Sequence, residues 1–156
     1  MLTMIPKMFS WTFSVMDGAD QVAHVVDLSW WADKGEFTVH NVTYTARREG
    51  VVSGAFILES AAGVLARAVK PSALRRSLIV EHAGREYTLR AASAFRREFV
   101  LLDGATRIGS LSPEGLVTRR AAVDLPPALP LVVRVFIIWL TATLWKHDEA
   151  AAAAAG

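Results

Sequence analysis

The longest apolar stretch of the chain lies near its C-terminal end, over Leu129–Trp145 (LPLVVRVFIIWLTATLW). From Leu131 to Trp145 the only charged residue is Arg134, and apolar side chains fall on every face of a helix with about 3.6 residues per turn. A helix that is apolar all round must be surrounded on all sides, by lipid or by protein. The pattern therefore predicts one helix over about 131–145, whose surroundings decide the architecture.

The rest of the chain has the pattern of short strands. Apolar and polar residues alternate, as in half-buried strands, and turn residues such as Asp17-Gly18, Lys34-Gly35 and Asp103-Gly104 separate the runs. The expected extended segments are Lys7–Met16, Gln21–Trp31, Glu36–Arg48, Val51–Glu59, Val64–Val69, Leu74–Glu81, Arg85–Ala91, Phe99–Leu102, Arg107–Leu111 and Leu116–Val123. We therefore expect ten to twelve short strands followed by one helix.

A repeat connects these segments. Phe13, Phe56 and Phe99 follow one another at a spacing of 43 residues. The same spacing relates three further sets, Val15, Leu58 and Leu101, then Asp17, Ser60 and Asp103, then Val22, Leu65 and Ile108. Unrelated hairpins with similar turns would also give some of these matches. A propeller needs about four or more blades, so three copies of about four strands favour a closed barrel instead.

A closed barrel would supply the protein surroundings that the helix needs. Fifteen residues of helix span about 22 Å, and strands of seven to nine residues span about 23–30 Å, so the helix could fill the lumen. A bilayer core needs about 20 apolar residues, and Arg134 lies within the apolar stretch. The sequence thus favours an all-β, closed antiparallel barrel around a central helix. A membrane anchor formed by residues 129–145 stays open as the alternative.

Composition adds a few limits. A chain of 156 residues is most simply one domain, which we place at residues 1–147, with a disordered alanine-rich tail at 148–156. The net charge of +2 gives no reason to expect nucleic acid as a partner. The chain has no cysteine, so disulfides and thiolate chemistry cannot occur. The N-terminus lacks the basic region of a signal peptide. We therefore expect a cytoplasmic protein, with peripheral membrane association as a further possibility.

The hairpins FILESAAGVLA and FVLLDGATRIGSL, the segment HAGREYTL and the stretch LPLVVRVFIIWL together resemble the tubby C-terminal-like superfamily. The resemblance covers about Phe9 to Trp145, and its specificity lies in the pattern and order of the segments rather than in any single motif. This superfamily includes tubby proteins, LURP-one-related proteins and phospholipid scramblases. It implies a twelve-stranded antiparallel barrel threaded by a C-terminal apolar helix.

The resemblance also implies a role at membranes. Tubby domains bind phosphoinositide headgroups through a basic cleft, and scramblases are linked to phospholipid movement. This chain departs from both, because it has no cysteine to palmitoylate and no D-x-D-x-D-G calcium loop. No tubby headgroup motif matches residue by residue, so no ligand contact is carried over. The resemblance therefore implies only that the partner is an anionic phospholipid or a membrane-associated protein.

Basic residues at strand connections are the candidate binding site. Arginine and lysine side chains there could hold anionic headgroups through charge-assisted hydrogen bonds. The candidate ligand-binding residues are Lys70, Arg75, Arg76, Arg96 and Arg97. A solvated surface without a ligand would show the same residues, in which case the barrel would be a soluble protein-interaction module.

We expect no enzymatic activity. The four histidines have no metal-ligand spacing, no G-x-S-x-G elbow presents a serine, and the glycines lack phosphate-loop spacing. A lumen filled by a helix would also leave no deep pocket. The sequence therefore predicts a non-catalytic binding module without a metal or cofactor.

Overall fold

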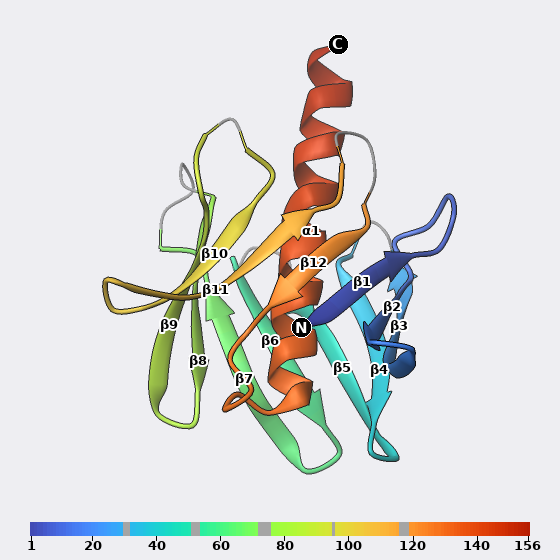
Figure 1. Ribbon diagram of the computed structural model, residues 1–156, viewed down its shortest axis with the longest axis vertical. Helices are drawn as coiled ribbons and strands as arrows, with labels where there is room; N and C mark the ends of the chain where they lie inside the picture. Colours follow the sequence, from blue (N-terminus) through green and yellow to red (C-terminus); the bar gives the residue numbers. More distant parts are fainter. Residues whose placement is uncertain (30–31, 51–53, 72–75, 95, 116–118) are drawn as a thin grey trace.

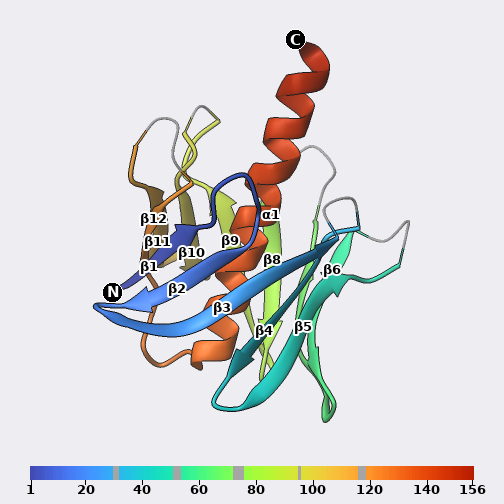
Figure 2. The same cartoon turned by 90° about the vertical axis from the view of Figure 1, so that its right-hand side faces the viewer.

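The computed structural model describes residues 1–29, 32–50, 54–71, 76–94, 96–115 and 119–156. Within these residues twelve strands form a closed antiparallel barrel around one helix, α1 (Leu131–Ala155) (Figures 1 and 2). The expected all-β barrel with a single C-terminal helix is confirmed. The strands are β1 (Leu2–Pro6), β2 (Phe13–Asp17), β3 (Asp20–Ser29), β4 (Lys34–Val39), β5 (Val42–Arg48), β6 (Ala55–Ser60), β7 (Gly63–Val69), β8 (Ser77–His82), β9 (Arg85–Ala91), β10 (Phe99–Asp103), β11 (Thr106–Pro113) and β12 (Ala121–Asp124).

The strand order gives the barrel two different ends. Each strand pairs with its sequence neighbours, and β1 pairs with β12 to close the ring. Odd-numbered strands therefore all run in one direction. The connections that follow them lie at the end where α1 emerges, which we call the exit end (Figure 1). The tight turns that follow β2, β4, β6, β8 and β10 lie at the other end, together with residues 125–130, and we call this the closed end.

The 43-residue repeat is present in the structure. Phe13, Phe56 and Phe99 lie at the start of β2, β6 and β10, and all three side chains are buried. The ladder register shifts once in each of the three hairpins, after Val15, after Leu58 and after Leu101. These three positions are again 43 residues apart. The barrel thus consists of three copies of a four-strand unit, each with a bulge at the same place.

Protein surrounds the helix. Thirteen of its residues, Val132, Val133 and Val135–Trp145, are buried inside the barrel. Phe56 and Phe99 pack edge-on against Trp139 and Trp145, with ring centroids 5.7 and 6.4 Å apart. The second and third units therefore direct their repeated phenylalanine at a helix tryptophan. No helix formed by the described residues combines the length and apolarity needed to cross a membrane.

The helix continues further than the sequence predicted. We expected it to end at Trp145 and residues 148–156 to be disordered, but α1 continues to Ala155. Alanine has the highest helix propensity, so residues 150–155 extend a helix that the barrel has already nucleated. This extension projects from the exit end and is exposed (Figure 1).

Three expected strand boundaries are wrong. Residues 7–12 form a connection rather than the first half of a strand, because Lys7 N donates to Thr12 O at 2.8 Å and closes a loop. The expected extended run Glu36–Arg48 contains a turn at His40 and Asn41, whose φ angles are +49° and +64°. Gly35 lies in β4 rather than in a turn. The predicted strand ends at residues 30–31, 51–53, 74–75 and 116–118 lie outside the described residues.

The seam between β3 and β4 departs from the threefold pattern. In the equivalent pairs, Ala66 to Val69 of β7 pair with β8, and Ser110 to Pro113 of β11 pair with β12. Among the described residues of β3 and β4, the ladder joins only Val26, Asp27 and Ser29 to β4. The two strands diverge from there toward the closed end (Figure 2). Within the described residues, the wall between β3 and β4 is therefore paired over a shorter stretch than at the two equivalent positions.

Candidate functional site

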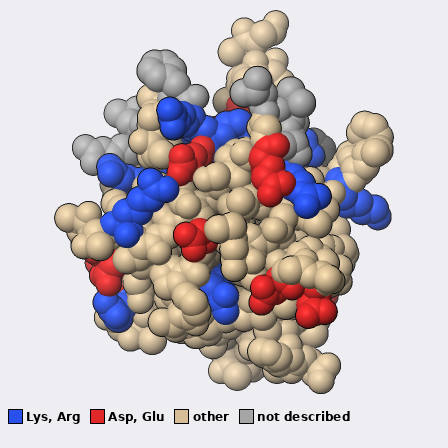
Figure 3. All heavy atoms as spheres, in the orientation of Figure 1, with Lys and Arg blue, Asp and Glu red and all other residues tan. Residues whose placement is uncertain are grey.

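The predicted lipid-binding residues lie at the exit end of the barrel. Lys70 and Arg96 are exposed, in the connections that follow β7 and β9. Within the described residues, no acidic side chain forms an ion pair with either of them. Arg75 lies outside the described residues. The face shown in Figure 3 has several lysine and arginine side chains toward this end, with acidic side chains among them.

Arg76 and Arg97 differ from Lys70 and Arg96 because they contact the helix. Arg76 forms an ion pair with Asp148 of α1 at 2.7 Å, and its guanidinium lies 5.3 Å from the centroid of the Phe99 ring. Arg97 places its guanidinium 5.3 Å from the Trp145 ring, and its carbonyl oxygen accepts a hydrogen bond from Trp145 Nε1 at 2.8 Å. These two arginines therefore fix the helix where it leaves the barrel.

Arg76 belongs to a set of three equivalent positions. Asp33, Arg76 and Arg119 are 43 residues apart, one in each repeat unit, and each forms an ion pair with the helix. Asp33 contacts Lys146 and His147, Arg76 contacts Asp148, and Arg119 contacts Glu149 at 3.1 Å. We call these three residues, together with residues 146–149, the helix clamp. The repeat thus holds one helix turn from three sides at the exit end.

Asp33 is the most deeply buried charged residue of the helix clamp, with a side chain that is 4% exposed. Its carboxylate contacts Arg48 Nη2 at 2.8 Å, His147 Nε2 at 2.9 Å and Lys146 Nζ at 3.6 Å. Burial alone would raise the pKa of the Asp33 carboxyl. The hydrogen bonds and charges of His147, Arg48 and Lys146 outweigh that effect and lower the pKa below its usual value.

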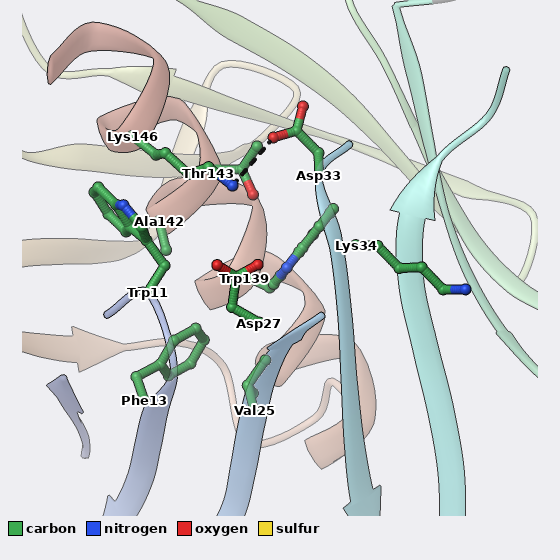
Figure 4. A pocket seen from close by; sticks show the side chains of 10 residues that line it. All are labelled: Trp11, Phe13, Val25, Asp27, Asp33, Lys34, Trp139, Ala142, Thr143 and Lys146. Carbon is green, nitrogen blue, oxygen red and sulfur yellow. Dashed lines mark ion pairs between the residues drawn. The ribbon is translucent and has the colours of Figure 1, made fainter. Parts of the chain in front are cut away.

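A small cavity lies beside the helix next to this carboxylate. Figure 4 shows its lining, in which Asp27, Asp33, Thr143 and Lys146 lie among aromatic and aliphatic side chains. The cavity leaves about 10 Å³ for the centre of a water molecule. That volume accommodates about one water and no metabolite. Two of these polar groups, Lys146 and Asp33, form an ion pair with each other (Figure 4).

The larger hollows are open depressions on the outer surface. The largest, of about 630 Å³, lies at the closed end between the β8–β9 turn and residues 126–130. Its charged residues include Arg85 and Asp103, which pair with each other at 2.6 Å. Within the described residues, no group of three or more potential metal ligands is present. Another of these hollows, of about 500 Å³, is lined by residues of β7 and the β8–β9 hairpin that include Glu81, His82 and Glu86.

Sequence reasoning missed most of the helix clamp. It singled out Arg76 from local charge and gave no role to Asp33 or Arg119. The available signal was the repeat itself, because Asp33 and Arg119 lie 43 residues on either side of Arg76. Charged residues at equivalent repeat positions point to a common structural partner, which here is the helix.

Comparison of the chain with models of known protein families, with curated proteins and with solved structures found no match. The likeness to the tubby C-terminal-like superfamily therefore rests on the pattern and order of its segments.

Proposed function

We propose that the protein is a non-catalytic module whose exit end docks on an anionic phospholipid surface. The observation that carries this proposal is the exposure of Lys70 and Arg96 at the same end of the barrel, each without an acidic partner among the described residues. Lys7, in the connection after β1, is a third exposed cation at this end. The superfamily resemblance gives the same expectation independently.

The expected binding free energy favours reversible binding to the membrane. Each basic residue near an anionic membrane contributes roughly 1 kcal/mol, so three give weak recruitment that salt reduces. Arg76 and Arg97 contribute less than we expected from the sequence, because their guanidinium groups already face Asp148 and Trp145. In this proposal the helix clamp organises the exit end, and the exposed cations contact the headgroups.

A soluble protein-interaction barrel is the rival function. The observation that favours it is the arrangement of Arg76, Arg97 and Arg119, which stabilise the helix and need no ligand. In that case Lys70 and Arg96 would only solvate the surface. The cavity beside the helix is too small for a substrate, which is compatible with both versions.

Vesicle co-sedimentation separates the two functions. We expect binding to vesicles that contain anionic phospholipid at low salt, weaker binding at physiological salt, and little binding to neutral vesicles. Lys70→Gln with Arg96→Gln should weaken binding about tenfold or more. The control is Arg85→Gln, which removes one positive charge beside the β8–β9 turn at the closed end. Equal binding by this control and by the Lys70→Gln, Arg96→Gln variant, or no binding by the wild type at low salt, contradicts the proposal.

A further inference from the structure

The connection between β1 and β2 exposes two large apolar side chains. Phe9 is 98% exposed and Met8 is 78% exposed, at the exit end of the barrel. Phe9 also has a φ of +59°, in the left-handed region that residues other than glycine, asparagine and aspartate seldom adopt. An asparagine or glycine would fit this position better both in backbone conformation and in solubility. Folding of the barrel alone thus gives no reason for phenylalanine here.

Neighbouring contacts fix the loop in this shape. Lys7 N donates to Thr12 O at 2.8 Å, and Thr12 N donates to Ser10 Oγ at 3.0 Å. Trp11 lies under the guanidinium of Arg119, 3.9 Å from the ring centroid.

Arg119 ties the loop to the helix clamp. One of its nitrogens donates to Ser10 O at 3.1 Å, and the other pairs with Glu149. Both sides of the Met8–Phe9 tip are therefore anchored. The two exposed side chains are presented by a defined loop, attached to the same helix turn as the rest of the exit end.

We propose that Met8 and Phe9 form an apolar anchor that enters the interfacial region of a phospholipid bilayer. This inference rests on the proposed function. It adds to the membrane binding free energy an apolar contribution that salt does not weaken. Lys7 adjoins the tip, and Lys70 and Arg96 lie at the same end, so cations are available for headgroups when the tip enters the lipid. A projecting aromatic side chain flanked by basic residues suits this boundary between apolar chains and charged headgroups.

The small apolar area of this tip favours lipid over a protein partner. A stable protein interface buries about 800 Å² on each side, whereas a large apolar side chain contributes at most about 150–250 Å². Met8 and Phe9 alone are too small for such an interface. A bilayer needs no complementary surface around them, because acyl chains adapt to the shape of what enters.

The absence of cysteine from the chain allows a direct test. We would replace Phe9 by cysteine, label it with an environment-sensitive thiol fluorophore, and add vesicles of anionic and neutral phospholipid, with or without a lipid-borne quencher. The expected result is a blue shift on binding and quenching by the lipid-borne group. The same label on Val64→Cys, an exposed apolar position beside the β6–β7 turn at the closed end, should stay in water.

Unlabelled variants provide the second measurement. Met8→Ser with Phe9→Asn removes the apolar surface, and asparagine tolerates the left-handed backbone of position 9. We expect the residual binding to anionic vesicles at about 1 M salt to fall by tenfold or more, because charge attraction is then screened beyond about 3 Å. Val42→Ser with Val64→Ser, at the closed end, should leave that binding unchanged.

The outcomes distinguish the two proposals. If the wild type binds anionic vesicles but the label at position 9 is neither shifted nor quenched, the anchor proposal fails and the proposed function stands. If Met8→Ser with Phe9→Asn has no effect at high salt, the anchor proposal fails in the same way. If the wild type binds no vesicles at low salt, both fail. If the wild type self-associates in sedimentation velocity and Met8→Ser with Phe9→Asn abolishes that association, the tip contacts a second copy of the chain and the anchor proposal fails.

Discussion

The imidazole Nε2 of His147 lies 2.9 Å from Oδ2 of Asp33, although 114 residues separate the two in the chain. The contact joins the part of α1 outside the barrel to the start of β4. It places a carboxylate that is only 4% exposed among three basic side chains. The attachment of the start of β4 to the exit-end part of α1 therefore depends on one buried carboxylate.

Asp33→Asn should lower the free energy of unfolding by about 3 kcal/mol at pH 7, because it leaves Arg48 and Lys146 without their partner. Asp20→Asn, at the exposed first residue of β3, is the control and should change stability little. Urea unfolding followed by circular dichroism measures both. Equal stability of Asp33→Asn and the wild type would show that the ion pairs contribute nothing.

The loss should also depend on pH in a defined direction. The pKa of Asp33 is lowered in the folded state, so its stabilisation is fully present above the unfolded pKa of about 3.9. It is then lost as the pH falls through the still lower folded pKa. The difference in unfolding free energy between wild type and Asp33→Asn should therefore shrink as the pH falls below about pH 4. A difference that grows below about pH 4 would contradict this assignment.

Gly35→Ala should destabilise the barrel by about 1–3 kcal/mol. A Cβ at Gly35 would lie 2.7 Å from Nε1 of Trp139, which is itself held between the helix and the wall. Gly54→Ala is the control, because its Cβ would meet Lys70 Cβ at an ordinary 3.4 Å. Thermal unfolding of the two variants gives the comparison. A Gly35→Ala protein as stable as Gly54→Ala would mean that Trp139 can move aside.

The repeat, the barrel and the identity of the helix could be predicted from the sequence, because each leaves a local periodic trace. Phe9 could not be placed, since the alternation of Phe9, Trp11 and Phe13 continues through a loop that a single left-handed residue has bent out of the strand. His40 and Asn41 lack the glycine that normally marks a tight hairpin turn. The pairing of Asp33 with His147 leaves no local trace at all.

Ile138→Asp should abolish folding. Ile138 is fully buried in the middle of the helix, where an unpaired carboxylate would have no hydrogen-bond partner and no access to water. Ala151→Asp introduces the same side chain on the exposed part of α1 and should leave the protein folded. Circular dichroism and the yield of soluble protein are the readouts. A folded Ile138→Asp protein would be incompatible with a helix buried in the lumen.

Phe9→Gly should raise the free energy of unfolding by about 1 kcal/mol, because glycine adopts a φ of +59° without steric conflict. Met8→Gly is the matched control and should give no gain, since Met8 does not have a left-handed backbone. Denaturant unfolding measures this change. If Phe9→Gly is destabilising, the phenylalanine contributes to the fold and the case for a lipid anchor weakens.

The helix that fills the lumen follows all twelve strands in the chain. During synthesis the wall of the barrel therefore emerges from the ribosome before the residues that will occupy its interior. Until α1 has been translated, the inward-facing side chains of the strands, among them Phe13, Phe56 and Phe99, have no helix to pack against. Formation of the core must therefore wait until α1 has been translated, and until then these apolar side chains of the wall lack their partner.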